Sequence, residues 1–145
     1  MQAEILFRPL ASSDYDQVIS LWQRCEGVEV AEGDDRASFD FYLRRNPGLS
    51  FVASLGREIV GATLCGHDGR RGLFYHLAVA PEHRGQGVGR KILQQGLAGL
   101  RAIGISRATI LVATDNPDGR AFWVRQGFEE IAGAIPLGID IPPKP

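Results

Sequence analysis

The sequence has little cysteine and no long apolar run. Its only two cysteines, Cys25 and Cys65, form neither a CxxC pair nor a set with metal-ligand spacing. We therefore predict two buried, reduced thiols in a cytoplasmic protein that has no metal site. No apolar stretch approaches the roughly 20 residues of a membrane span, and the first residues lack the pattern of a signal peptide.

An excess of charge of one sign is also missing. The chain has 16 basic and 17 acidic side chains, a net charge of −1. Such a balance gives no general affinity for nucleic acid or for a membrane, so we predict neither as a partner, and any basic site must be local. The 145 residues suit one domain, and no repeat or linker divides them. We predict a single domain over 1–145, with a frayed, proline-rich tail at 141–145.

Hydrophobic periodicity predicts a mixed α/β (α+β) sheet in the order βααβββαβαββ. Strands are expected at 4–8, 49–55, 58–66, 73–79, 108–113, 129–134 and 135–141. Helices are expected after an N-cap at Ser13, around 39–43, at 92–103 up to Gly104, and between Asn116 and Gly127. Residues 26–35 are acidic and contain glycine, which is typical of a loop.

The segment 84–89 reads Arg-Gly-Gln-Gly-Val-Gly and lies between a buried strand and a helix. The first amides of a helix have no internal partner, and the helix dipole adds about half a positive charge there. Glycines let a ligand approach the backbone closely, and Arg84, Arg90 and Lys91 add charge at the rim. This pattern predicts a site for a pyrophosphate, against the alternative of a simple tight turn.

Two familiar phosphate motifs do not fit this segment. A Walker A turn ends in Gly-Lys-Ser/Thr, whereas Gly89 is followed by Arg90 and Lys91, so the hydroxyl for magnesium is absent. The dinucleotide fingerprint needs G-x-G-x-x-G, whereas the glycines here are Gly85, Gly87 and Gly89. That fingerprint also follows the first strand of its fold. The turn is therefore expected to hold a different phosphate ligand.

Arg84-x-x-Gly87-x-Gly89 resembles the Q/R-x-x-G-x-G/A motif of the GCN5-related N-acetyltransferases, the GNAT family. The run 77–89 is similar to the family's fourth strand and pyrophosphate loop, and 121–128 loosely resembles its A-x-x-F-Y-x-x-x-G-F pattern. The resemblance covers nearly the whole chain and is strongest over 73–128. It implies the acyl-CoA N-acyltransferase fold, with the central strands 73–79 and 108–113 splayed apart, and acetyl-CoA as co-substrate.

The resemblance also implies how the cofactor is held. The pantetheine arm would pair with the strand at Leu77 and Val79, and an amide near Leu77 or Ala78 would stabilise the oxyanion. Asn116 matches a pantetheine-contacting asparagine, although it also suits an N-cap. The full set of cofactor-binding residues implied in this way is Leu77, Ala78, Val79, Arg84, Gly85, Gln86, Gly87, Val88, Gly89, Asn116 and Phe122.

The proton transfers have several candidate residues. Leu73 stands where some relatives have a glutamate, and Tyr75 shares its face of the strand, so Tyr75 could position a water or the amine. His76 is the better base, but it points to the other face unless a bulge intervenes. Trp123 stands where the family usually has the tyrosine that acts as general acid. An indole can donate a hydrogen bond but cannot deliver a proton. Each could instead be a core or rim residue.

The combined hypothesis is an N-acetyltransferase that transfers acetyl directly to an amine in a ternary complex. The acceptor is an amine on a small molecule, a peptide or a protein, and a homodimer remains open. The acidic segment 29–35 could attract a cationic amine or could simply be solvated. The alternatives are a non-catalytic acyl-CoA-binding or regulatory domain, an acyltransferase with another acyl group or acceptor, and a pure interaction module.

Overall fold

The computed structural model describes residues 3–145 and contains one mixed sheet. The strands lie in the order β1-β2-β3-β4-β5; the first four are antiparallel, and β5 runs parallel to β4. The strands are β1 (Ile5–Pro9), β2 (Phe51–Leu55), β3 (Glu58–His67), β4 (Gly72–Val79) and β5 (Ala108–Ile110). The helices are α1 (Tyr15–Gln23), α2 (Arg36–Arg45), α3 (Val88–Ala102) and α4 (Pro117–Arg125), with 3₁₀ turns η1 (Ser12–Asp14) and η2 (Pro81–His83). The predicted mixed α/β class is confirmed.

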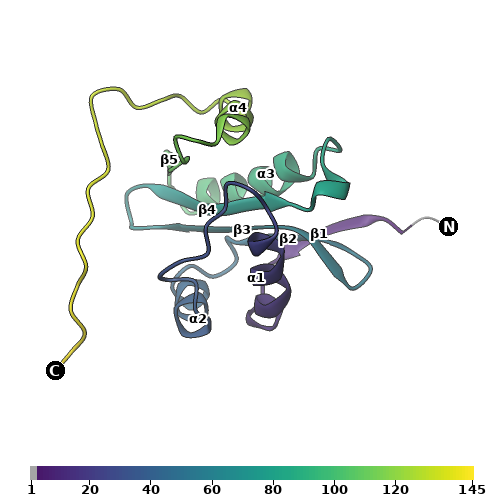
Figure 1. Cartoon of the computed structure of the whole chain (residues 1–145), viewed down its shortest axis with the longest axis horizontal. Coiled ribbons are helices and arrows are strands. Elements are labelled where there is room, and N and C mark those ends of the chain that lie inside the picture. Colours follow the sequence, from purple (N-terminus) through teal and green to yellow (C-terminus); the bar gives the residue numbers. More distant parts are fainter. Residues whose placement is uncertain (1–2) are drawn as a thin grey trace.

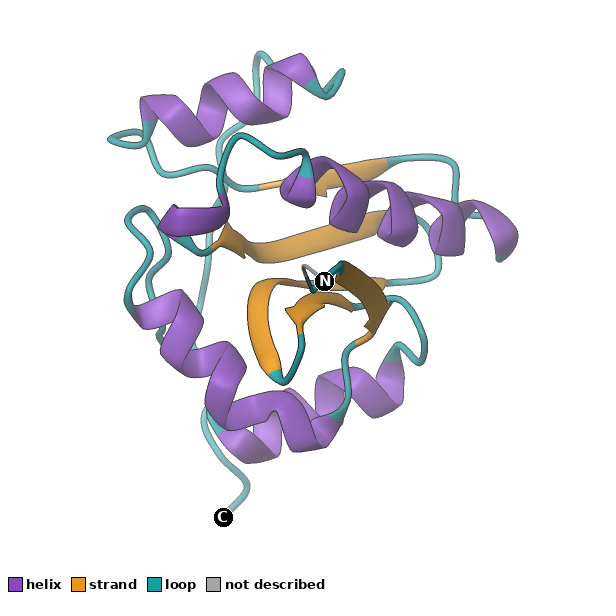
Figure 2. Cartoon of the chain, turned by 90° about the vertical axis from the view of Figure 1, so that its right-hand side faces the viewer, coloured by secondary structure: helices purple, strands orange, loops and turns teal. Residues whose placement is uncertain are grey.

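Helices cover both faces of the sheet, as Figures 1 and 2 show. On one face α1 and α2 bury Val18, Trp22 and Phe39 against the strands. On the other face α3 and α4 bury Leu93 and Trp123 with other apolar side chains. Both cysteines are buried free thiols, as predicted. Among residues 3–145, no helix is long and apolar enough to cross a membrane.

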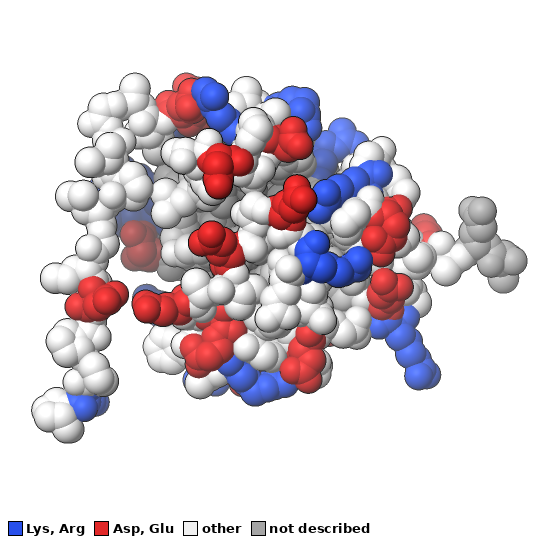
Figure 3. Space-filling view, viewed as in Figure 1, with Lys and Arg blue, Asp and Glu red and all other residues white. Residues whose placement is uncertain are grey.

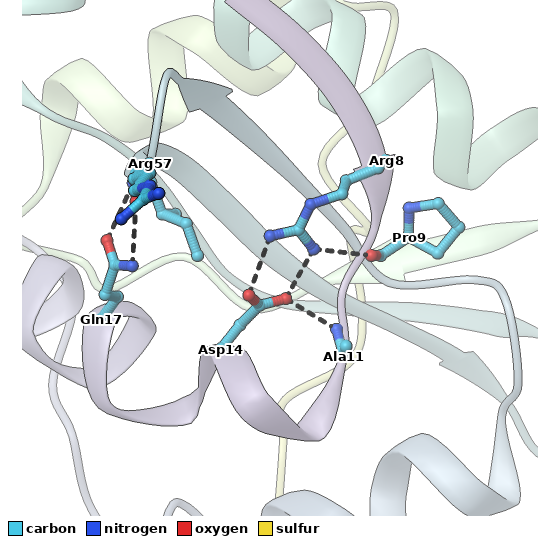
Figure 4. Close-up of polar contacts among 7 residues, drawn as sticks. Arg8, Pro9, Ala11, Asp14, Gln17 and Arg57 are labelled. Carbon is cyan, nitrogen blue, oxygen red and sulfur yellow. Dashed lines mark hydrogen bonds and ion pairs between the residues drawn. The ribbon is translucent and has the colours of Figure 1, made fainter.

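The start of the first helix differs from the prediction. Ser13 caps nothing; a 3₁₀ turn comes first, and α1 begins at Tyr15. The backbone is held instead by Asp14, whose Oδ2 accepts a hydrogen bond from the Ala11 amide at 2.8 Å. Figure 4 shows the same carboxylate gripped from β1 by both terminal nitrogens of Arg8, at 2.7 and 2.9 Å. Asp14 therefore outcompetes the serine hydroxyl because a bidentate, charge-assisted contact is the stronger one.

Two of the predicted strands are wrong. Residues 129–134 and 135–141 form no strand, so the order within the described chain is βααβββαβα. Figure 1 shows this segment leaving α4 and running alongside the molecule to the C-terminus. Apolar side chains do alternate with others here, but a strand also needs a partner edge. Pro136 lacks a donor, and β5 ends at Ile110, so no neighbouring ladder extends to this segment.

Candidate functional site

The site begins where β4 and β5 part. The parallel pair holds only three register matches, the last of which joins Phe74 to Ile110. Beyond this point β4 continues to Val79, while the chain after Ile110 is no longer a strand. The predicted splay of the central strands is therefore present, and it leaves the second half of β4 without a neighbour on its β5 side. A backbone with free donors and acceptors can pair with an extended ligand.

A bulge in β4 lies next to this opening. Leu64 pairs with Tyr75 and Ala62 pairs with Ala78, so His76 and Leu77 together face the single residue Thr63. His76 has a φ of 56°, the only positive φ among the described non-glycine residues. The Thr63 hydroxyl donates to the Tyr75 carbonyl at 3.0 Å and holds the bulge. The bulge moves His76 to the same face as Tyr75. From the sequence, a shared face was expected only if a bulge intervened.

The glycine-rich turn has the backbone that an anion site requires. Gly85 and Gly87 have φ of 76° and 79°, values that favour glycine, and Gly87 is the residue before α3. A Cβ at Gly85 would meet nothing within 4 Å. In the described chain the amides of residues 85–87 form no hydrogen bond. Val88 and Gly89 are the first residues of α3, so their amides have no helical carbonyl four residues earlier to donate to. Several amide donors without a partner among the described residues therefore lie together at one helix N-terminus.

The remaining predicted cofactor residues surround this turn. The Val79 carbonyl accepts from Arg84 Nε at 3.0 Å and from the Cys25 thiol at 3.7 Å, so it faces away from β3. Phe122 of α4 lies against Gly89, where a Cβ would stand 3.4 Å from its ring. Ala78 pairs with Ala62 of β3. Leu77 lies within the bulge, and Val88 is buried in the core.

Asn116 caps α4, since its Oδ1 accepts from the Gly119 amide at 3.0 Å. Its side chain also lies against Gly27, where an added Cβ would clash with Nδ2. The loop 26–35 therefore reaches the N-terminus of α4, and Figure 1 shows it rising from α1 past β4. Gln86 and the pantetheine contact of Asn116 stay predictions, because they concern a ligand and the contacts above are within the chain.

A pocket of about 260 Å³ lies on the α2 face, beside the start of the splay. It is lined among others by Tyr42, Asn46, Arg71, Leu73, Tyr75 and Thr109. The rings of Tyr42 and Tyr75 meet edge to face, with centroids 6.0 Å apart. Burial raises the pKa of both phenols, so both stay protonated at neutral pH and can act as donors. Tyr42 was not identified from the sequence, where it looked like a core residue of a short helix.

His76 has a carboxylate partner that the sequence analysis missed. Its Nε2 lies 2.9 Å from Oδ2 of Asp34, in the loop between α1 and α2. The Asp34 side chain is only 7% exposed, and the same Oδ2 accepts from the Ala31 amide at 3.0 Å. Trp22 packs beside the imidazole, with ring centroids 4.9 Å apart. No sequence signal could have found this pair, because 42 positions separate its members.

Trp123 lies on the opposite side of the sheet from Tyr75 and His76. Its ring packs against Phe74, Phe122 and Phe128, with centroid distances of 6.1, 5.3 and 4.9 Å. Only 7% of the residue is exposed. These contacts favour the core position given above as the alternative for Trp123, and a donor role for the indole stays a prediction.

Charge of both signs surrounds the opening. In Figure 3 acidic side chains are scattered over the front and lie between the basic ones on the right, so this view shows no patch of one sign. Among residues 3–145, no group of three or more His, Cys, Asp or Glu side chains could hold a metal ion.

Comparisons with known proteins agree with this geometry. The sequence model described as the acetyltransferase (GNAT) family matches residues 15–128. An acetyltransferase of Sodalis glossinidius is 32% identical over 131 residues, covering 90% of this chain and 92% of the relative. The solved structure of Ard1 from Thermoplasma volcanium has a TM-score of 0.78 at 21% identity, covering 88% of this chain and 84% of that one. PaiA N-acetyltransferase from Thermoplasma acidophilum, solved in complex with coenzyme A, has a TM-score of 0.77 at 17% identity, with coverages of 87% and 90%.

Proposed function

The chain belongs to the acetyltransferase (GNAT) family, and we propose that it transfers the acetyl group of acetyl-CoA directly to an amine in a ternary complex. The observation that carries the proposal is that a cofactor-type site and a pocket for an acceptor lie beside the same opening between β4 and β5. An anion-binding turn and an unpaired strand lie together, and a pocket opens on the α2 face beside them. A cofactor and an acceptor could then meet at the bulge in β4.

The residues of the turn fit coenzyme A. Its pyrophosphate needs converging amide donors and room at the backbone, which Gly85, Gly87 and the start of α3 provide. Arg84 and Arg90 add positive charge at the rim, and Phe122 closes one side against Gly89. Beyond Phe74 the β5 side of β4 has no strand partner in the described chain and can pair with the amide groups of the pantetheine arm, which would replace Arg84 as the donor to the Val79 carbonyl. When bound, acetyl-CoA supplies the thioester carbonyl that the amine attacks.

The pocket beside Tyr75 is the proposed entrance for the acceptor. It lies on the face where α2 covers the sheet, and Tyr75 and His76 both turn toward that face because of the bulge. An alkyl amine has a pKa near 10.4, so removing its proton at pH 7 costs about 4.6 kcal/mol. A protonated Tyr75 can hold the amine or a water in place, and a separate group must accept the proton.

Direct transfer is favoured over an acetylated enzyme. Cys65 is fully buried, and burial raises the pKa of its thiol to about 12, so little thiolate exists at neutral pH. Cys25 is buried as well, and its thiol faces the Val79 carbonyl rather than a base. Neither thiol is activated as a nucleophile. The acceptor amine is then the only nucleophile the reaction needs.

The turn is tested by Gly87→Glu with Gly133→Glu as its matched control. Both glycines have nearly the same φ, 79° and 80°, so the two variants carry similar backbone strain, but Gly133 lies in the C-terminal segment. We expect calorimetry to show acetyl-CoA binding in the control and none in Gly87→Glu, since a carboxylate there repels the pyrophosphate. Equal binding by both variants would exclude this turn as the cofactor site.

Transfer itself is tested by thiol release with a panel of small amines, peptides and proteins. Release that depends on an amine, with acetylated product in the mass spectrum, would support the proposal. Acetyl-CoA binding without turnover on any acceptor would favour the non-catalytic alternative. Comparison of acetyl-CoA with longer acyl-CoA esters would then separate an acetyltransferase from another acyltransferase.

A further inference from the structure

We propose that Asp34 is a positioning residue for His76, and that His76 Nδ1 accepts the proton of the incoming amine. The inference rests on the proposed acetyl transfer and deepens it by naming the proton acceptor and the group that orients it. It starts from the contact of 2.9 Å between His76 Nε2 and Asp34 Oδ2. The pair joins the bulge of β4 to the loop between α1 and α2.

The hydrogen bonds at Asp34 determine the tautomer of His76. The Ala31 amide donates to Oδ2, which is also the atom that faces His76 Nε2. A carboxylate only accepts hydrogen bonds, so the proton between the two side chains belongs to Nε2. In the neutral imidazole the other ring nitrogen is then an acceptor. No partner for Nδ1 occurs among the described residues, so Nδ1 is left available for a proton.

Several contacts fix the carboxylate in place. The Tyr15 hydroxyl donates to the Asp34 carbonyl at 2.7 Å, and the Asp34 amide donates to the Ala31 carbonyl at 3.1 Å. The Ala31 amide also donates to the Asp34 side chain, so both the backbone and the carboxylate of Asp34 are held by hydrogen bonds. A buried, oriented carboxylate stabilises the imidazolium that forms when Nδ1 takes a proton. His76 has a φ of 56° within the bulge, and the Trp22 ring packs beside its imidazole.

Two of the side chains beside His76, those of Tyr75 and Trp22, cannot take the proton of the amine. The ionisable neighbours of His76 are Asp34, which is already paired with its Nε2, and Tyr75 from its own strand, whose ring centroid lies 6.3 Å away. Tyr75 keeps its proton at neutral pH because burial raises its pKa. From α1 the neighbour is the Trp22 indole, which does not titrate. Tyr75 also lines the acceptor pocket, so the neighbouring imidazole is close to the amine's entrance.

The step balances as a proton transfer followed by acyl transfer. The ammonium group gives one N–H proton to Nδ1, and its electron pair becomes the nucleophile. The N–C bond forms at the thioester carbonyl, and the C–S bond breaks with its electrons on sulfur. The amide nitrogen loses its second proton to solvent. The Nδ1 proton then passes to the thiolate or to water, which returns His76 to the neutral form.

The tautomer is tested without turnover, by ¹⁵N-detected NMR of the histidine rings in the full chain. We expect His76 to be protonated at Nε2 in the wild-type protein and to become a mixture of tautomers in Asp34→Ala. Protonation at Nδ1 in the wild type would overturn the proposal. The matched control is Asp140→Asn, which removes one carboxylate from the exposed C-terminal segment and should leave the His76 spectrum unchanged.

Kinetics separate a positioning role from a structural one. We expect kcat to fall 10- to 100-fold in Asp34→Asn and at least 100-fold in His76→Gln, while the KM for acetyl-CoA stays within twofold. The glutamine side chain can still donate a hydrogen bond to Asp34 but has no basic nitrogen. The variant therefore keeps the structural contact with the loop and loses only the proton acceptor. A wild-type kcat in His76→Gln would overturn this inference alone. Failure of the wild-type protein to acetylate any amine, with acetyl-CoA still bound, would overturn the acetyl transfer and the base role together.

Discussion

The pKa of single residues in this protein is shifted by burial or by a close partner, and Asp14 is the clearest case of a partner. Its carboxylate receives two hydrogen bonds from Arg8 and one from the Ala11 amide, and its side chain is 10% exposed. The hydrogen bonds from Arg8 are the main reason that the pKa of Asp14 lies below its ordinary value of 3.8. The ion pair thereby ties β1 to the turn that begins α1.

Acid should release this tie. Because the folded state holds the pKa of Asp14 below that of the unfolded chain, the pair contributes stability above the ordinary value of 3.8, and the contribution is lost as pH falls through the lower folded value. Asp14→Asn should therefore cost about 1–3 kcal/mol of unfolding free energy at pH 7, and much less near pH 2. Urea unfolding at both pH values measures the difference. An equal loss at the two pH values would mean that packing, not charge, stabilises the contact.

Cysteine reactivity is a second property of single residues. Cys65 is fully buried, and burial raises the pKa of its thiol to about 12. We expect a thiol reagent at pH 8 to modify it only at the rate of unfolding, so modification should accelerate with denaturant in parallel with loss of structure. Fast labelling of Cys65 in the native protein, located by mass spectrometry against a Cys65→Ala control, would contradict the buried position.

At the scale of elements, two helix caps with similar bond lengths to the backbone allow structure and cofactor binding to be separated. Asp35 caps α2 by accepting from the Ser38 amide at 3.1 Å, and Asn116 caps α4 by accepting from the Gly119 amide at 3.0 Å. Either cap replaced by alanine should cost about 1 kcal/mol of stability. Asn116 lies between β5, which parts from β4, and α4, whereas Asp35 begins α2.

Asn116→Ala should therefore weaken acetyl-CoA binding, whereas Asp35→Ala should not. We expect calorimetry to show a rise in Kd of roughly 5- to 10-fold for Asn116→Ala, equivalent to about 1–1.4 kcal/mol for one lost contact. Asp35→Ala should lower the thermal midpoint to a similar degree and leave the Kd unchanged. If both variants bind acetyl-CoA like the wild type, Asn116 is a cap and nothing more.

The bulge shows what sequence periodicity can and cannot supply at this scale. Strict alternation along β4 predicts that Tyr75 and His76 point to opposite faces, and the structure has both turned toward α1 and α2. The difference arises from one extra residue opposite Thr63 and from the positive φ of His76. A histidine carries no sequence signal for that conformation, so the bulge could be named only as a condition. Its partner Asp34 comes from tertiary contact and was invisible for the same reason.

Across the whole molecule, segments shaped by local interactions are the ones that the sequence predicts best. The glycine turn and the helix α3 depend on residues close by in the chain and were predicted closely, and β4 was predicted within one residue because it also has a ladder with β3. The splay of β4 and β5 came from the family resemblance. The prediction of strands at 129–134 and 135–141 was wrong. Alternating apolar residues match the strand pattern, but a strand also needs a neighbouring strand to hydrogen-bond with, and β5 is only three residues long.

That failed segment leads to a prediction about the entire chain. Ile135, Leu137, Ile139 and Ile141 are 79–91% exposed. The ion pair between Arg120 and Glu130, at 2.7 Å, lies before them in the chain. Removal of residues 135–145 should leave the acetyl-CoA affinity unchanged and shift the thermal midpoint by less than about 2 °C, since almost no buried area is lost.

The same truncation should reduce aggregation. It removes four large, exposed apolar side chains at alternating positions, and such a segment favours association between molecules. Light scattering at rising protein concentration measures this directly. A clearly lower thermal midpoint in the shortened chain, together with a smaller mass by sedimentation, would instead mean that the segment is covered in solution by a second copy of the protein. The exposed isoleucines would then be interface residues, and the homodimer left open by the sequence would gain its contact surface.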